Sequence, residues 1–590
     1  MHVHPTHLLA RFHAPGDAEE HHATPANAAG THALGPLAVD LTAVSDAGWT
    51  WSVANRSDRP VAVRSVALVH AVDSVPPVRM FRHGYQSWSP TGVGVLGIDA
   101  DPSTVADLEL MQAGYHADQR RVADGELRSE LVTLLADSSG ATALLLGFDG
   151  GSEHDGTFRL RAIGDGRADL LVEAFLGDAV LAPGEQRTLH AVAVDATDAS
   201  PSDKLAAWAA RVGSANGART TAPYQVGWCS WYQYFTEITE ELLRANLALA
   251  ADWPFEVFQL DDGYQANIGD WLRTNDTFPS DLDAIADEIR AAGRTPGIWL
   301  APFLAAADSD LSARHPDWFA RFRQDDEDHG PLRTWWNPAW SQADAGFQRG
   351  LDTTNPDVLA HLEATAAALV DAGFDYLKLD FTFSPSADGG YHDPSRTPAQ
   401  RVRAGFDAIR RGAGERTFLL GCGVPLGPVI GAVDGVRIGQ DVAPVWSLAP
   451  GTETIAGYLD VEPAVRHAYG NTVTRAFQHR RLWLNDPDCL MLRTTATDLS
   501  PAAVRTWADT IAMSGGMVLV SDDLALLDRS ARSLLDETIA LGRQVDAESV
   551  AGRTAYAPDL LERTLPTRLE AAGRTLLVDP DDGTSILTER

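Results

Sequence analysis

The hydrophobic pattern of this chain changes its rhythm near residue 220. Before that point, short alternating or continuous apolar runs are separated by Gly, Pro, Asp and Asn. The runs are PLAVDLTAV, WTWSVAN, PVAVRSVALV, ELVTLLA, ATALLLGFD and DLLVEAFLG. Such runs are typical of antiparallel strands, because successive side chains of a strand face opposite sides of its sheet. Residues 1–215 are therefore predicted to form an N-terminal antiparallel β-sandwich.

After a Gly-, Ser- and Thr-containing boundary at Val212–Pro223, short apolar segments that end in polar residues alternate with helix-period segments. The strand candidates are QVGWCSW, FEVFQLDD, TPGIWLAPF, DYLKLDF, TFLLGCG, GVRIGQD, RLWLND and GGMVLVSD. Helical segments such as SDLDAIADEIRAAG and DVLAHLEATAAALVDAG lie between them and end in Gly, a common helix stop. Eight strand–helix units over residues 220–530 predict a central (β/α)₈ TIM barrel.

The end of the chain returns to short β-type segments, namely TAYAP, LERTL, GRTLLVD and TSILTER. Residues 535–590 are predicted to form a small C-terminal β domain. A chain of 590 residues exceeds the ~250–300 at which single hydrophobic cores stop growing. The prediction is thus a multidomain α/β protein.

Charge and cysteine content narrow the classes of partner. The formal charge of −34 argues against nucleic acid and anionic membranes as partners. No apolar run reaches the ~18 residues that span a bilayer, and the N-terminus lacks the basic and apolar regions of a signal peptide. Three cysteines without CxxC spacing predict neither disulfides nor a zinc site, so we expect a cytoplasmic protein.

Acidic residues recur where the predicted barrel strands end. Asp261 and Asp262 end the second strand, Asp380 the fourth and Asp441 follows the sixth, while Asn485 and Asp486 end the seventh. One such Asp is often only a helix N-cap. Several at the C-terminal ends of barrel strands predict an active site, because that face carries the active sites of TIM barrels.

Lysine is rare in this chain, since only Lys204 and Lys378 occur among 47 basic residues. Lys204 is placed in a polar linker. Lys378 lies in the apolar run YLKLDF and needs a partner there, because a bare buried charge is costly. The period of two places Lys378 and Asp380 on the inner face of their strand. The same count puts Arg437 and Asp441 on one face; purely structural buried ion pairs are the alternative reading.

Two carboxylates with different surroundings suit a retaining glycosidase. Asp380, two residues from Lys378, is the candidate nucleophile, because a neighbouring cation lowers the pKa of a carboxylate and keeps it ionised. Asp441, on a loop near apolar Val442, Pro444 and Trp446, is the candidate acid/base, which needs a raised pKa. Arg437 is expected to point at the sugar or at Asp380, because contact with Asp441 would oppose protonation.

Tryptophans supply candidate sugar platforms. Trp228, Trp231, Trp299 and Trp335 lie at or just past strand ends, where each can be either a platform or a core residue. Trp88, in FRHGYQSWSP, can cap the barrel mouth or belong to the sandwich core.

At these residues the chain resembles the α-galactosidases of glycoside hydrolase family 36, in clan D. The matching segments are GYQSWSP, GWCSWYQYF, FQLDDGYQ, GIWLAPF, YLKLDF, GCGVPLGPVIGAVDGVRIGQDVAP and LWLNDPDCLMLR, from about residue 80 to 495. The C-terminal appendage is shorter than in the longer, tetrameric family members, which leaves the oligomeric state open.

The resemblance implies hydrolysis of terminal α-galactosyl residues from melibiose- or raffinose-type substrates, with retention and without a cofactor or metal. Asp380 would be the nucleophile and Asp441 the acid/base. The implied sugar-binding residues are Asp261 and Asp262 at O4 and O6, Lys378 at the ring hydroxyls, Cys422 and Arg437 near O2, and Trp299, Trp231 and Trp88 around the galactose.

Four other functions remain open on the sequence. Two keep the fold and the site, namely an α-N-acetylgalactosaminidase and a galactosyl transferase. A third is a catalytically silent sugar-binding protein, which the presence of both Asp380 and Asp441 disfavours. The fourth is a metal-dependent barrel lyase or isomerase with Lys378 as base, which a chelator would inactivate.

Overall fold

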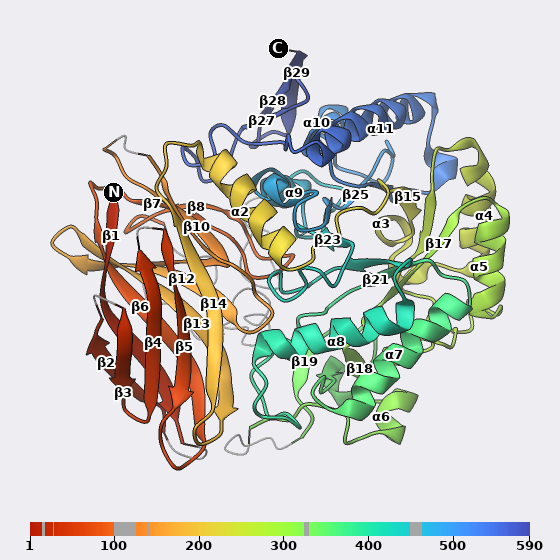
Figure 1. Cartoon of the computed structure of the whole chain (residues 1–590). Coiled ribbons are helices and arrows are strands. Elements are labelled where there is room, and N and C mark those ends of the chain that lie inside the picture. Colours follow the sequence, from red (N-terminus) through yellow and green to blue (C-terminus); the bar gives the residue numbers. More distant parts are fainter. Residues whose placement is uncertain are drawn as a thin grey trace.

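The protein is described here from a computed structural model that covers residues 1–14, 18–26, 29–45, 47–99, 125–139, 142–323, 330–448 and 463–589. Its N-terminal part consists of two antiparallel sheets (Figure 1). The first has the order β2 (Glu20–Pro25), β1 (His2–His13), β6 (Val61–Asp73), β13 (Arg167–Leu181), β12 (Asp155–Gly164) and β9 (Glu126–Glu130). The second has the order β3 (Gly30–Leu34), β4 (Leu37–Ser45), β5 (Gly48–Asn55), β14 (Gln186–Asp195), β11 (Leu144–Phe148), β10 (Val132–Ala136), β7 (Arg79–Arg82) and β8 (Gly92–Val95).

The helix α2 (Pro201–Ala215) departs from the prediction that residues 1–215 are β-structure throughout. Its sequence has apolar residues at helical spacing, and Ser200 caps its first turn. Lys204 therefore lies on a buried helix face and not in a polar linker. Its Nζ donates to the carbonyls of Ala143 at 2.6 Å and Asp195 at 3.2 Å, so it joins α2 to the sandwich.

The central part is a parallel sheet with the strand order β24-β23-β22-β21-β17-β16-β15-β26-β25. All eight predicted strands are present, as β15 (Val226–Cys229), β16 (Val257–Leu260), β17 (Thr295–Leu300), β21 (Tyr376–Leu379), β22 (Phe418–Gly421), β23 (Gly435–Arg437), β24 (Leu484–Asp486) and β26 (Val518–Val520). The last strand of the order, β25 (Cys489–Leu490), follows β24 after two residues, so the sheet curls until its edges approach each other. The fold is TIM-barrel-like.

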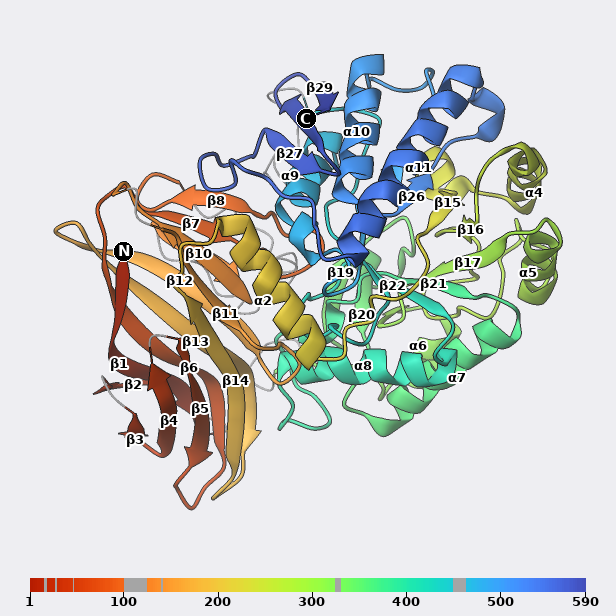
Figure 2. The same cartoon turned by 45° about the horizontal axis from the view of Figure 1, so that its top comes forward.

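Helices connect most of these strands on the outside of the sheet (Figure 2). They are α4 (Glu240–Leu249), α5 (Leu282–Ala291), α7 (Pro356–Asp371), α8 (Pro398–Ala413), α9 (Val465–Thr474) and α10 (Pro501–Ser514), and α11 (Arg529–Val550) follows the last strand. Residues 422–434, between β22 and β23, form turns where the strand–helix pattern predicts a helix. An insertion after β17 adds the short helix α6 (Asp310–Arg314) and a small sheet of β18 (Leu304–Ala306), β20 (Phe347–Gly350) and β19 (Arg333–Trp336).

A three-stranded antiparallel sheet of β27 (Arg568–Ala571), β28 (Arg574–Asp579) and β29 (Thr584–Glu589) ends the chain beside α10 (Figure 1). The long helix α11 reaches Val550, so this sheet begins later than the predicted bound of residue 535. Within the described part of the chain, no helix has the length and apolar character needed to cross a membrane.

Candidate active site

Four aspartates follow strands of the parallel sheet at one edge. Asp261 and Asp262 follow β16, Asp380 follows β21, and Asp441 lies four residues after the end of β23. Because all of these strands are parallel, their carboxyl ends meet at the same edge of the curled sheet.

The carboxylate of Asp380 is buried and held by two donors. The indole Nε1 of Trp299 donates to its Oδ2 at 3.0 Å, and the backbone N–H of Phe381 donates to its Oδ1 at 2.7 Å. Burial raises the pKa of Asp380 above its ordinary value, although the charge of Lys378 and the Trp299 bond act in the opposite direction. The expected lowered pKa is thus wrong, because desolvation outweighs the charge of the lysine.

Two other predicted site residues, Asp441 and Cys422, also affect the pKa of Asp380. The negative charge of Asp441 raises its pKa, and a hydrogen bond from the Cys422 thiol lowers it. The structure therefore brings Asp380, Asp441, Cys422 and Trp299 into one cluster.

Lys378 finds its direct partner across the sheet. Its Nζ lies 2.9 Å from Asp261 Oδ2, and both side chains are buried. The Gln259 amide and the Cys229 thiol also donate to that oxygen. Lys378 thus contacts Asp261 and acts on Asp380 through its charge, and its bond helps to hold the Asp261 carboxylate in a fixed orientation.

Asp262 occupies a different environment one residue later. Trp340 Nε1 donates to its Oδ2 at 2.7 Å, and Gln265 Nε2 donates to its Oδ1 at 2.6 Å. Burial raises its pKa to about 6, assisted by the charges of Asp261 and Asp380. The carboxyl of Asp262 therefore takes up a proton more readily than an ordinary aspartate.

This raised pKa predicts a pH-dependent stability. The carboxyl of Asp262 has an ordinary pKa of 3.8 when unfolded and about 6 when folded, so between these values the folded state binds the proton more tightly. Stability from this group is complete below pH ~4 and falls by up to ~3 kcal/mol as the pH rises through about 6. Asp262→Asn is expected to remove that slope in denaturant-unfolding curves at pH 4, 5, 6 and 7. Parallel pH dependences for the two proteins would contradict the environment described for Asp262.

Asp441 is more exposed than Asp380, with 38% of its side chain accessible. Arg437 Nη2 lies 2.9 Å from its Oδ1, so the expectation that Arg437 points away from Asp441 is wrong. The same nitrogen contacts Asp488 Oδ2. This contact arises because Arg437 and Asp441 are four residues apart and the chain turns directly after β23.

Trp88 lies with the barrel residues and not in the sandwich core. Its ring packs against Phe381 with centroids 5.1 Å apart and against Trp335 at 6.2 Å. The buried guanidinium of Arg475 fixes the segment that carries Trp88, because it donates to the carbonyls of Ser87 at 2.7 Å and Ser89 at 2.8 Å. The N-terminal part of the chain thus places the indole of Trp88 beside Phe381, the residue that follows Asp380.

The remaining tryptophans divide into core and candidate platform. Trp228 is fully buried, stacks on Phe258 at 4.3 Å and donates to the Asp522 carbonyl, which makes it a core residue. Trp231 begins the short helix α3 (Trp231–Tyr234) after β15 and packs on Phe235 at 5.1 Å. Its place in a sugar site stays a prediction.

Sequence reasoning missed Trp340, Tyr232 and Asp488. Trp340 lies in the insertion after β17, whose sequence carries no readable periodicity. Asp488 belongs to the segment LWLNDPDCLMLR but follows Pro487 between β24 and β25. A buried Arg on the neighbouring strand, which requires an acid, is the signal that could have found it.

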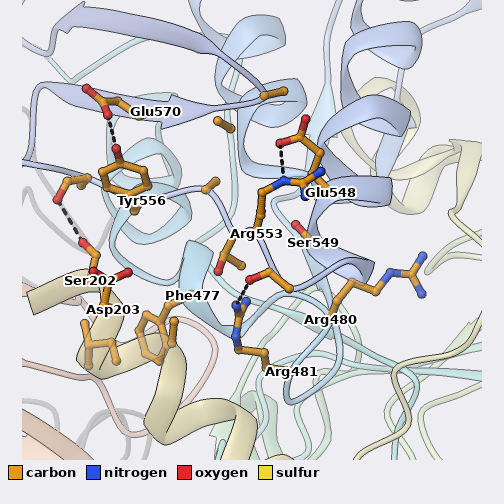
Figure 3. Close-up of a pocket in the computed structure, with 18 of the residues that line it drawn as sticks. Ser202, Asp203, Phe477, Arg480, Arg481, Glu548, Ser549, Arg553, Tyr556 and Glu570 are labelled. Atoms are coloured by element: carbon orange, nitrogen blue, oxygen red, sulfur yellow. Dashed lines mark hydrogen bonds and ion pairs between the residues drawn. The ribbon is translucent and has the colours of Figure 1, made fainter. Parts of the chain in front are cut away.

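A cavity of about 750 Å³ lies elsewhere, between α2, the end of α11 and the C-terminal sheet (Figure 3). Its charged side chains are largely paired, as in Tyr556 with Glu570 and Arg553 with Glu548. None of the aspartates described above lines it.

Comparison with known proteins agrees with this arrangement. Residues 225–386, which include β15 to β21 and Asp380, match the sequence model of the Melibiase family. The resemblance to the family 36 α-galactosidases is confirmed. The α-galactosidase AgaA of Geobacillus stearothermophilus is 25% identical over 182 residues, and an Escherichia coli α-galactosidase is 27% identical over 159 residues. These alignments cover 30% and 26% of this chain but only 22% and 20% of the two relatives.

Solved structures extend the likeness in fold over nearly the whole chain. An α-galactosidase of Thermus thermophilus, in complex with p-nitrophenyl α-D-galactopyranoside, has a TM-score of 0.67 at 26% identity. The superposition covers 91% of this chain and 95% of that one. The Geobacillus AgaA structure, at 14% identity and a TM-score of 0.59, covers 95% of this chain and 71% of its own, and supports the fold.

Proposed function

We propose that this protein is a retaining α-galactosidase that hydrolyses terminal non-reducing α-D-galactosyl residues of melibiose- and raffinose-type oligosaccharides. The observation that carries the proposal is that Asp380 and Asp441 follow β21 and β23 at the carboxyl ends of one barrel-like sheet, where the charge of Asp441 raises the pKa of Asp380. Asp380 is buried and fixed by Trp299, whereas Asp441 is partly exposed. A nucleophile needs the fixed, buried position of Asp380, and an acid/base that exchanges protons with the leaving group and water needs the partly exposed position of Asp441.

In this mechanism Asp380 attacks the anomeric carbon from the face opposite the leaving group while Asp441 protonates the glycosidic oxygen. Water activated by Asp441 then releases galactose from the covalent galactosyl–enzyme, so the configuration is retained. A retaining enzyme needs its two carboxyl groups ~5–5.5 Å apart when substrate is bound. Trp299 holds Asp380 in one orientation, which favours attack at a single carbon.

The sugar-binding roles follow from the resemblance and are part of the proposal. Asp261, oriented by Lys378, and Asp262 would accept hydrogen bonds from the O4 and O6 hydroxyls. Lys378 would also reach a ring hydroxyl, and Cys422 and Arg437 would lie near O2. Trp299, Trp231 and Trp88 would enclose the apolar C–H faces of galactose.

The wider setting belongs to the same proposal. We take the curled sheet as a closed (β/α)₈ barrel and the three parts of the chain as domains. The first two lie near 1–215 and 220–530, and the C-terminal β domain begins after α11, later than the predicted 535. Three unpaired, buried cysteines support a cytoplasmic location. Stachyose is bound by the Thermus thermophilus relative, at 27% identity, which supports an oligosaccharide substrate for this chain.

An α-N-acetylgalactosaminidase is the second candidate. A Flavonifractor plautii enzyme described as an A type blood α-D-galactosamine galactosaminidase is 27% identical over 164 residues. Cys422, buried beside Asp380, favours a 2-hydroxyl over the bulkier 2-acetamido group.

One assay separates these functions. Nitrophenyl α-galactoside, α-glucoside and N-acetyl-α-galactosaminide are compared by kcat/KM, with NMR of the first anomer released and a parallel reaction in chelator. The proposal expects preference for the galactoside, α-galactose as first product and no effect of the chelator. A β-galactose first product would replace retention by inversion, and loss of activity in chelator would favour a metal-dependent barrel enzyme.

A further inference from the structure

A buried cluster behind Asp441 joins three strands of the barrel-like sheet. Asp488, between β24 and β25, accepts hydrogen bonds at its Oδ2 from Tyr232 Oη at 2.5 Å and from the backbone N–H of Val442 at 2.8 Å. Arg437 Nη2 contacts the same oxygen. Cys489 N–H donates to the other carboxylate oxygen at 2.7 Å. Asp488 therefore binds the backbone N–H of the residue after Asp441 and also the arginine that contacts the Asp441 side chain.

Arg437 Nη2 is shared among more acceptors than it has hydrogens. Besides Asp488, it lies 2.9 Å from Asp441 Oδ1, 3.2 Å from the Gln440 carbonyl and 3.2 Å from Tyr232 Oη. An Nη nitrogen carries two N–H groups. Asp488 and Asp441 therefore compete for the same donor, and a firmer hold by one weakens the hold on the other.

Asp488 has a backbone conformation that an aspartate rarely adopts. Its φ is 95°, a region that residues with a Cβ rarely occupy. A carboxylate held in this conformation by four donors has an orientation that the surrounding structure determines.

We propose that Asp488 is a positioning residue for the acid/base, and that it sets the proton affinity of Asp441 by withdrawing Arg437 from it. This inference rests on the proposed function. With Arg437 shared, Asp441 can hold a proton for the leaving group. After the proton has gone, Arg437 is still near enough to stabilise the Asp441 anion, and the proton returns from the water that attacks the galactosyl–enzyme.

The charged and titratable groups around this cluster are consistent with that competition. Those that face Asp488 are Arg437, Asp441, Asp486, Tyr232 and Cys489. Those that interact with Asp441 are Arg437, Asp488, Asp380, Tyr232 and Cys422. Burial raises the pKa of Asp488, while the charge of Arg437 and the hydrogen bond from Tyr232 act in the opposite direction.

The test is the pH profile of kcat/KM on melibiose, whose glucose leaving group needs a proton. In Asp488→Asn the anionic competitor is gone, so Arg437 holds Asp441 as an anion. The basic limb of the profile is expected to move down by about one pH unit, with a ~10-fold loss above the limb.

Tyr232→Phe is expected to move the limb in the opposite direction, by about half a unit upward. Loss of the phenol removes a 2.5 Å bond to Asp488 and only a 3.2 Å contact to Arg437, so Asp488 holds the arginine more firmly. This variant keeps every charge, so it preserves the test if Asp488→Asn does not fold.

Asp522→Asn is the matched control. Asp522 is a fully buried carboxylate after β26 that pairs with Arg493 Nη1 at 2.9 Å, so it reproduces a broken buried Asp–Arg pair away from Asp441. It should lower the unfolding midpoint without moving the limb.

Each outcome assigns a cause. Opposite shifts for the two variants support the positioning role, whereas unmoved limbs with a uniform loss of rate would mean that Asp488 only stabilises the fold. If the wild-type protein turns over no α-galactoside, the proposed function fails and this role fails with it.

Discussion

Replacement of Asp380 by Ala is expected to lower kcat on the order of 10⁴–10⁶-fold, the range seen when a covalent nucleophile is removed from its constellation. The loss should be equal for nitrophenyl α-galactoside and melibiose, because both need the same attack at the anomeric carbon. The measurement is kcat/KM for both substrates on freshly purified protein.

Asp380→Asn is the matched control for folding. Asn retains a side-chain oxygen that can accept from Trp299 Nε1. It also removes a buried carboxyl group whose pKa is raised by burial. Its unfolding midpoint should equal or exceed that of the wild type while activity is lost. A stable Asn variant with activity within tenfold of the wild type would exclude Asp380 as the nucleophile.

The Ala variant also permits a positive test of the mechanism. Azide can enter the space left by the carboxylate and attack the anomeric carbon from the same face, with the leaving group departing opposite. An α-galactoside would then yield β-galactosyl azide in a single displacement. Formation of the α-azide would place the nucleophile on the other face and contradict the arrangement.

The sequence predicted the strand positions and the edge at which the site lies. Each apolar segment that ends in a polar residue became a strand of the parallel sheet, because burial on both faces requires a continuous apolar run. The period of two also predicted that Lys378 and Asp380 lie on the same face of their strand. Both contact other residues of the site, because Lys378 contacts Asp261 and Trp299 contacts Asp380.

The partners of these side chains could not be predicted in the same way. Lys378 pairs with Asp261 across an intervening strand, a contact that depends on how the sheet curls and on no local pattern. Arg437 contacts Asp441 because the chain turns after three residues of β23. Asp488 could not be predicted as a partner of Arg437, because the seventh strand ends at Asp486 and Pro487 interrupts its alternation of inward and outward side chains. α2 was missed because its position in a β-rich region outweighed its own helical spacing.

Replacement of Asp441 by Ala is expected to separate substrates by their leaving groups. General acid catalysis contributes ~10²–10⁴-fold, so kcat/KM on melibiose should fall by that factor. Nitrophenolate leaves without a proton, so kcat/KM on the nitrophenyl galactoside should fall far less. The comparison uses kcat/KM because it reports the steps up to formation of the galactosyl–enzyme, before Asp441 is needed again as a base.

Slow hydrolysis of that intermediate gives the Asp441 variant a second signature. Stopped-flow mixing with the nitrophenyl substrate should release a burst of nitrophenolate equal to the enzyme concentration, followed by a slow phase. Azide needs no general base, so it should accelerate the slow phase and give α-galactosyl azide, the anomer opposite to the one expected from Asp380→Ala.

Asp441→Asn is the matched control, because it keeps a side chain that accepts from Arg437 and cannot donate an acidic proton. It should behave as the Ala variant does on both substrates. Equal losses on melibiose and the nitrophenyl galactoside, or a slow phase that azide leaves unchanged, would show that Asp441 exchanges no proton. The exposed carboxylate beside Arg437 would then serve only to bind sugar, and another group would have to supply the proton.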